Sequence, residues 1–137
     1  MPSQSTQVGA KVTFTAAPIG EGPFTYQWKT NGVEITGATS STYTIASVTM
    51  SDVAAYTVVV DNAACEPVES LPAYLVIRPA LHISLAPPNV TLTWTGNFQL
   101  QSADSMSATF TDVTGVVTGP YTTPITGERK FFRLRVP

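Results

Sequence analysis

Three scarcities limit what this sequence can be. Cys65 is the only cysteine among its 137 residues, so the chain cannot close an intramolecular disulfide. His82 is the only histidine, and one histidine with one cysteine cannot complete a zinc site. Charged residues make up 12% of the chain, about half the usual share. With a net charge of −2, the chain lacks the basic footprint of a nucleic-acid-binding protein.

Long apolar runs and helical periodicity are also missing. No apolar run approaches the ~20 residues of a membrane helix, so we expect no membrane insertion. Residues 1–7 have neither the basic nor the apolar region of a signal peptide. No window repeats apolar residues at helical spacing, which argues against any substantial helix. Because threonine and valine are abundant instead, the composition predicts an all-β fold.

Apolar and polar residues alternate along several segments of the first half of the chain, as they do in half-buried strands. The pair Asn31-Gly32 predicts a tight hairpin, because both central residues of a type I′ turn need positive φ. Residues 68–77 predict one long strand, in which Pro72 marks an edge or a bulge. Residues 1–7 are either frayed or a first edge strand.

Residues 43–60 read Y-T-I-A-S-V-T-M-S-D-V-A-A-Y-T-V-V-V and predict two strands joined across a corner. In the second half, residues 90–95 and 98–103 predict two strands around a hairpin at Gly96-Asn97. The last strand, K-F-F-R-L-R-V, places alternate residues on opposite faces. Phe132, Leu134 and Val136 face one way, and Phe131, Arg133 and Arg135 face the other.

Residues 8–77 resemble an immunoglobulin-like domain of the I-set type, in the version common in bacterial surface proteins. The resemblance lies in G-A-K-V-T-F-T-A, in Y-Q-W-K-T-N-G-V-E-I and in the stretch from Y-T-I-A-S to D-V-A-A-Y-T-V. It implies that Trp28 is the core tryptophan, that Tyr56 is the tyrosine-corner residue and that Asp52 is the turn aspartate. The two core cysteines of the family would fall at Ala16 and Val58, so the resemblance implies apolar packing, including that of Val58, in place of their disulfide.

Residues 80–137 resemble a short fibronectin-III-like β domain found at the C-terminal ends of bacterial secreted proteins. The matching segments are L-T-W, F-Q-L-Q-S-A, T-D-V and F-F-R-L. The resemblance implies a trimmed sandwich with Trp94 in its core. Together the two resemblances predict two small β-sandwiches in tandem, the first immunoglobulin-like, with domains 1–78 and 79–137.

The residues that carry catalysis or bind cofactors are sparse. His82 has the opposite parity to its apolar neighbours, so we expect a solvent-facing strand residue and not a catalytic one. The nine acidic residues are scattered, and none forms the carboxylate pair of a glycosidase. Asp61, Glu66 and Glu69 flank one loop, where a calcium site is an alternative to an ordinary solvated loop. We therefore predict no catalytic activity and no cofactor.

Two places are candidates for interaction. Asn62, Cys65 and Glu66 fall in the predicted loop at the end of the sandwich where immunoglobulin variable domains carry their binding loops. Cys65 is either an intermolecular cross-link or an inert small residue. On the last strand, the face of Phe131, Arg133 and Arg135 either discourages edge-to-edge aggregation or binds a partner strand or acidic patch. Exposed rings among Phe24, Tyr43, Tyr74 and Tyr121 are candidates for stacking on sugars.

These observations predict a non-catalytic structural or adhesive module of a bacterial cell-surface or extracellular protein, which includes a subunit of an extracellular assembly. The alternative is a polysaccharide-binding accessory module. The expected partners are a protein or glycan surface, or a second copy of the chain, with no nucleic acid. An extracellular or cell-surface location follows from the resemblances.

Overall fold

The computed structural model describes residues 1–62, 66–116, 118–127 and 129–137. The chain divides into two compact units, Met1–Arg78 (unit 1) and Pro79–Pro137 (unit 2). The described residues form fourteen strands and one short 3-10 turn, Met50–Asp52. In the described residues each unit contains two β-sheets, so the prediction of an all-β chain of two sandwiches is confirmed.

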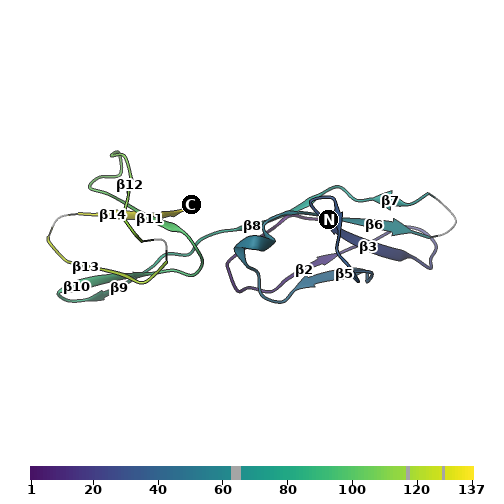
Figure 1. Cartoon of the computed structure of the whole chain (residues 1–137), viewed down its shortest axis with the longest axis horizontal. Coiled ribbons are helices and arrows are strands. Elements are labelled where there is room, and N and C mark those ends of the chain that lie inside the picture. Colours follow the sequence, from purple (N-terminus) through teal and green to yellow (C-terminus); the bar gives the residue numbers. More distant parts are fainter. Residues whose placement is uncertain (63–65, 117, 128) are drawn as a thin grey trace. The chain divides into compact units, whose positions relative to one another are not determined.

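Unit 1 places a larger sheet against a two-stranded one (Figure 1). The larger sheet has the order β1-β8-β6-β3-β4, and β7 also pairs with β6. Its strands are β1 (Gln4–Thr6), β3 (Thr25–Thr30), β4 (Val33–Glu34), β6 (Ala55–Asp61), β7 (Val68–Glu69) and β8 (Ala73–Ile77). The smaller sheet pairs β2 (Val12–Thr15) with β5 (Thr42–Ile45). The hairpin between β3 and β4 is confirmed, since Asn31 has φ 47° and Gly32 has φ 81°.

A cluster of aromatic rings fills the space between the two sheets of unit 1. Phe14 of β2 stacks on Tyr56 of β6, with ring centroids 4.8 Å apart. Tyr43 of β5 lies 6.0 Å from Trp28 of β3, which is fully buried. Val58 is also buried and pairs with Trp28 across the sheet. Such burial contributes roughly 1.5–3 kcal/mol for a valine, so apolar packing holds the sheets together at this position.

In two segments of unit 1, residues 1–7 and 68–77, the strands are not those that the alternation of apolar and polar residues alone indicates. Residues 1–7 contain an edge strand, β1, which pairs in parallel with β8. The single long strand predicted over residues 68–77 is wrong, because the chain leaves the ladder between β7 and β8. Pro72 in this gap has no N–H to donate to a ladder. Ser70 makes two hydrogen bonds to Val58 of β6 in this gap. Its N–H donates to the Val58 carbonyl at 2.9 Å, and its hydroxyl oxygen accepts from the Val58 N–H at 3.2 Å.

Unit 2 also has two layers, with strand orders β13-β10-β9 and β12-β11-β14 (Figure 1). The strands are β9 (His82–Ala86), β10 (Asn89–Thr93), β11 (Gln99–Ala103), β12 (Thr111–Asp112), β13 (Tyr121–Pro124) and β14 (Phe131–Arg135). Leu92, Trp94, Phe98 and Leu100 are buried and form the centre of its core.

The predicted hairpin at Gly96-Asn97 is wrong. The strands on either side, β10 and β11, belong to different sheets. A type I′ turn needs positive φ at both central residues, and here Gly96 has φ 92° whereas Asn97 is not among the residues of positive φ. The chain instead crosses from one layer to the other. Trp94, before the crossing, and Phe98, after it, are both buried.

Gly119 provides a test of the core of unit 2. A Cβ at this position would lie 3.0 Å from the backbone nitrogen of Trp94 and 3.1 Å from its ring. The backbone cannot move aside easily, so we expect Gly119→Ala to lower the free energy of unfolding by about 1–3 kcal/mol. Denaturant unfolding followed by tryptophan fluorescence measures this effect.

Gly22→Ala is the matched control, because Gly22 also precedes a proline but its Cβ would make only ordinary contacts, at 3.5 Å or more. Equal unfolding midpoints for the two variants would contradict the packing of Gly119 against Trp94.

Candidate functional site

The predicted core residues are held inside the two units and do not reach the surface. Trp28 is 0% exposed, and its indole N–H donates to the Ser40 carbonyl at 2.8 Å. Tyr56 and Val58 are buried beside it in unit 1, and Trp94 is buried in unit 2. These side chains position the strands, and of the four only Val58 also lines a cleft.

Asp52 and Tyr56 form the corner between β5 and β6. One carboxylate oxygen of Asp52, Oδ2, accepts from both the N–H (2.8 Å) and the hydroxyl (2.7 Å) of Thr49. The Tyr56 hydroxyl then donates to the Asp52 carbonyl at 2.9 Å. The aspartate therefore closes the short 3-10 turn, and the tyrosine fastens that turn to the start of β6.

The environment of Tyr56 raises the pKa of its hydroxyl above the ordinary value. Burial of the ring is the main cause, because the charged form is poorly solvated there. The negative charge of Asp52 and the neighbouring Tyr43 act in the same direction, and Thr30 acts in the opposite one. The neutral hydroxyl that donates to the corner is thus the favoured form.

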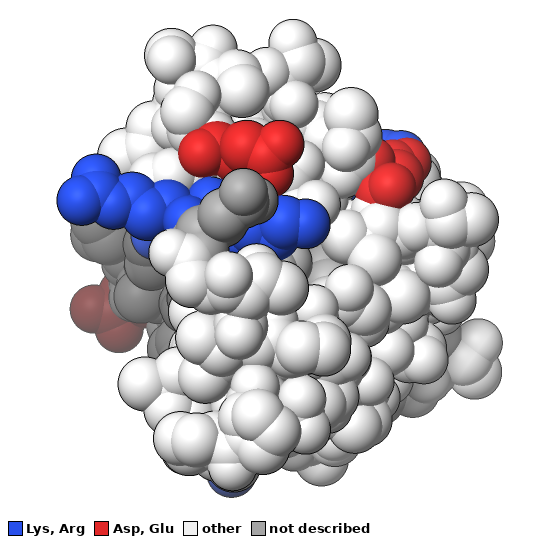
Figure 2. Space-filling view, turned by 90° about the vertical axis from the view of Figure 1, so that its left-hand side faces the viewer, with Lys and Arg blue, Asp and Glu red and all other residues white. Residues whose placement is uncertain are grey.

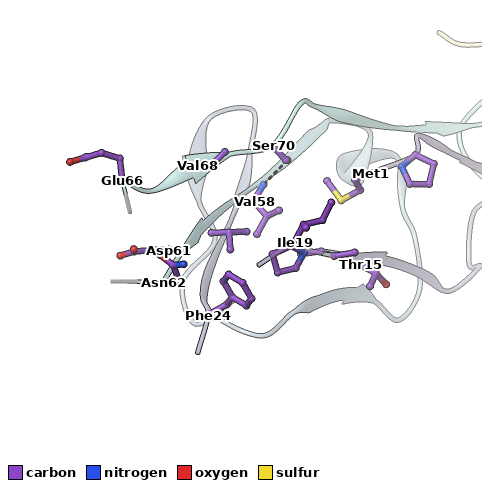
Figure 3. A pocket seen from close by; sticks show the side chains of 15 residues that line it. Met1, Thr15, Ile19, Phe24, Val58, Asp61, Asn62, Glu66, Val68 and Ser70 are labelled. Atoms are coloured by element: carbon purple, nitrogen blue, oxygen red, sulfur yellow. Dashed lines mark hydrogen bonds between the residues drawn. The ribbon is translucent and has the colours of Figure 1, made fainter. Parts of the chain in front are cut away.

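A cleft of about 660 Å³ opens in unit 1 (Figure 3). Phe24, Val58 and Val68 contribute to its apolar lining, and polar residues of the loop after β6 lie toward one end. Figure 3 shows Glu66 at that end with its carboxylate directed away from the apolar side chains. This arrangement, an apolar surface beside an acidic group, suits contact with another surface better than catalysis.

The structure brings two of the three predicted loop residues together at this cleft. Asn62 and Glu66 both line it, and the Asn62 side chain donates to the Glu21 carbonyl at 3.4 Å. Cys65 lies outside the described residues. Sequence patterns did not indicate the apolar lining, because Val68 alternates with its neighbours just as a core valine does.

The alternative of a calcium site gains no support from the described residues, in which no group of three potential metal ligands comes together. Glu69 instead accepts hydrogen bonds from the Thr57 hydroxyl (2.6 Å) and the Lys29 ammonium (3.0 Å). These bonds, that from Thr57 first, lower the pKa of Glu69. Its carboxylate therefore ties β7 to β6 and β3.

The arginines predicted for interaction on β14 make contacts within unit 2. Arg133 donates to the Gln101 side chain at 2.8 Å, and its guanidinium lies 4.3 Å from the centre of the Phe110 ring. Arg135 holds both oxygens of Asp112, at 2.7 and 3.1 Å. Hydrogen bonds from Arg135 and then Gln101 lower the pKa of Asp112. Sequence patterns missed this network, since its members come from three separate strands.

Charge is otherwise thinly spread. On the face drawn in Figure 2, uncharged side chains cover most of the surface, and basic and acidic side chains lie next to each other in one band. Phe131 on β14 is half-buried, and His82 on β9 is exposed.

The described aromatic residues do not form a flat surface on which sugar rings could stack. Of the four rings considered as candidates, Tyr74 is 55% exposed, whereas Phe24, Tyr43 and Tyr121 are half-buried. The large apolar residues that are exposed in the described chain include no aromatic residue besides Tyr74. A flat row of rings that can stack on a polysaccharide is therefore not present in this part of the chain.

The described residues contain no helix with the length and apolar character needed to cross a membrane.

Comparison with known proteins identifies the fold. No protein-family model matches the sequence, and no curated protein is significantly similar to it in sequence. Among solved structures, the chain is similar to immunoglobulin domains 1–5 of Sidekick-1, with 13% identity and a TM-score of 0.55 over 96% of this chain. It is also similar to three N-terminal domains of the Highly Immunogenic Outer Capsid protein (Hoc) of bacteriophage RB49, with 18% identity and a TM-score of 0.51 over 96% of this chain.

This chain spans 34% of the Sidekick-1 structure and 52% of the Hoc structure, so it is less than two thirds as long as either. At these identities the likeness concerns the fold alone. It confirms the predicted immunoglobulin-like fold.

The Tyr56 corner gives a stability prediction. We expect Tyr56→Phe to lower the free energy of unfolding by about 1–3 kcal/mol at neutral pH, because the Asp52 carbonyl loses its donor. Since the pKa of Tyr56 is raised in the folded state, its contribution is fully present below the unfolded value of about 10. That contribution is lost as the pH rises through the folded pKa, so the difference between wild type and variant should shrink above about pH 10.

Urea unfolding at neutral and alkaline pH measures both effects. Tyr74→Phe is the control, because the Tyr74 ring is largely exposed on the same sheet. An unchanged midpoint for Tyr56→Phe at neutral pH would count against the corner.

Proposed function

We propose that this chain is a non-catalytic structural and adhesive module of a bacterial cell-surface or extracellular protein, and that unit 1 bears mechanical load within it. The observation that carries the proposal is the parallel pairing of β1 with β8. β1 is the first strand of unit 1, and β8 is the last strand before the boundary at Arg78. Any force transmitted along the chain through unit 1 therefore acts on this pair.

The geometry of the pair determines how it resists such a force. Gln4 pairs with Leu75 and Thr6 with Ile77, and the Arg78 N–H donates to the Thr6 carbonyl at 2.8 Å. Because the strands are parallel, a pull on the start of β1 and on the end of β8 slides one strand along the other. All the hydrogen bonds of the pair are then loaded together in shear, instead of opening one after another. This arrangement suits a module that stays folded under tension.

The solved structures with the same fold include an outer capsid protein, which agrees with a surface role without establishing it. The bacterial source and the I-set assignment rest on the sequence resemblance. For residues 79–137 we propose a fibronectin-III-like domain, a view supported by the two three-stranded layers β13-β10-β9 and β12-β11-β14. For residues 1–78 we propose an immunoglobulin-like domain that carries the adhesive surface.

A protein partner at the cleft of unit 1 suits the structure better than a polysaccharide. The cleft combines apolar walls, to which Phe24, Val60 and Val68 contribute, with an acidic residue, Glu66. Apolar cores beside polar rims are typical of protein interfaces. A polysaccharide-binding module would instead need exposed rings, and the described residues expose only the ring of Tyr74 to a large extent.

Single-molecule stretching of the chain by its two ends tests the load-bearing role. The Thr6 carbonyl accepts from Arg78, the residue after β8, so the parallel ladder directs the Thr6 N–H toward β8 as well, and the Ser5 N–H points away. Proline has no N–H to donate. We therefore expect Thr6→Pro to lower the unfolding force of unit 1 markedly, and Ser5→Pro to leave most of it.

Two results would sink the proposal. One is an equal unfolding force for wild type and Thr6→Pro. The other concerns the rate at which Thr6→Pro unfolds in denaturant, without force. If that rate rises enough to account for the whole drop in unfolding force, a general loss of stability explains the drop and the β1–β8 pair has no special mechanical role.

A further inference from the structure

An apolar strip on the inner face of β9 is left uncovered. Ile83 pairs with Leu92 of β10, and Leu85 pairs with Val90. Residues directly opposite each other in an antiparallel pair have their side chains on the same face. Leu92 is 0% exposed, so this is the face that packs into the core, yet Ile83 is 60% exposed and Leu85 is 74% exposed. No described residue covers the side chains that β9 places on this face to the extent that Leu92 of β10 is covered.

The facing layer of unit 2 ends in an open strand edge. β14 pairs with β11, and no other described strand pairs with it. Its residue Leu134 lies opposite Leu100, which is fully buried, so Leu134 and Phe132 face the interior. Along the outer edge of β14, alternate backbone N–H and C=O groups are without a partner strand, which makes the edge a template for pairing.

The two features meet in one groove. A groove of about 280 Å³ is lined by Ile83 and Leu85 of β9, by Phe132 of β14 and by Lys130 just before β14. It thus has an apolar wall on one layer and the start of a free strand edge on the other. Ile83 and Leu85 are two residues apart, which is the repeat of side chains on one face of a strand.

We propose that this groove binds an extended segment of a partner polypeptide, which adds to the sheet as a further strand beside β14. The backbone of the segment pairs with the free edge of β14, as in other cases of strand addition. Its alternate apolar side chains enter the groove and cover Ile83 and Leu85. The sheet of β12, β11 and β14 gains a strand opposite β9, and the exposed part of the core becomes buried.

Charge identifies the chemistry of the partner. Among the described residues, Lys130 is the only charged one that lines the groove, and Arg133 lies on the opposite face of β14. A segment that alternates apolar residues with aspartate or glutamate places its apolar side chains in the groove and its carboxylates on the face of β14 that carries Arg133. A second copy of β14 does not fit, because antiparallel pairing centred on Arg133 would set that arginine against its own counterpart, and like charges directly opposite are destabilising. The partner is therefore an acidic and apolar strand of different sequence.

Fluorescence anisotropy with the full chain tests this proposal. The probe is a labelled synthetic peptide that alternates valine with glutamate, and the reference peptide alternates valine with lysine. We expect the glutamate peptide to bind and the lysine peptide to bind at least about tenfold more weakly. Leu85→Ser should weaken binding of the glutamate peptide roughly tenfold or more, because an apolar contact of the size of leucine is lost.

Leu71→Ser is the matched control, since Leu71 of unit 1 is also a well exposed leucine (83%, against 74% for Leu85) and its loss should leave binding unchanged. Methylation of alternate peptide nitrogens gives a second readout that leaves the protein intact. Only the set of nitrogens that faces β14 should abolish binding when methylated, because the other set makes no bond to the edge.

Several outcomes would overturn the proposal. They are no binding at about 1 mM peptide, equal binding of the two peptides, an unchanged affinity of Leu85→Ser, or equal effects of the two methylation sets. A concentration-dependent dimer in light scattering that Leu85→Ser dissociates would assign the groove to a second copy of the chain instead.

Discussion

The burial of one tryptophan between two sheets is the interaction on which each unit depends. Trp28 in unit 1 and Trp94 in unit 2 are both almost completely removed from solvent. In unit 1, the aromatic ring of Tyr56 and the side chain of Val58 complete the packing. The chain contains a single cysteine and cannot close a disulfide, so apolar burial has to supply the cohesion between the layers. This requirement explains why the aromatic residues are mostly internal and not available for a ligand.

The edges of the sheets separate the roles of the two units. In unit 1, β1 covers the edge of β8, and this closing pair lies where a force along the chain would act. In unit 2, β14 has no described partner on its outer side, and Ile83 and Leu85 on β9 are exposed opposite that edge. In unit 1, the strand edge that bears the proposed load is thus paired. In unit 2, the edge of β14 is free to pair with a strand of another polypeptide.

The few charged groups mainly brace the sheets. Glu69 links strands of unit 1 through Lys29, and Asp112 links strands of unit 2 through Arg135. Both carboxylates are largely exposed, so each pair contributes modestly to stability and less at high salt. These four charges are engaged within the units, whereas the surfaces proposed for recognition combine apolar residues with other charged groups: the cleft with Glu66 and the groove with Lys130. The sequence suggested the loop at the first and did not indicate the second.

Local features could be read from the sequence by itself, and long-range pairing could not. The Asn31-Gly32 turn depends on the φ preference of two adjacent residues, so its sequence determines its structure. The sequence Gly96-Asn97 predicts the same kind of turn, but the flanking strands β10 and β11 belong to different sheets. Burial of the neighbouring core residues outweighs the turn preference of these two residues. Likewise Leu85 alternates just as Leu92 does, yet only Leu92 is buried. Alternation determines which face a side chain takes, and only the presence of an opposing strand decides whether that face is covered.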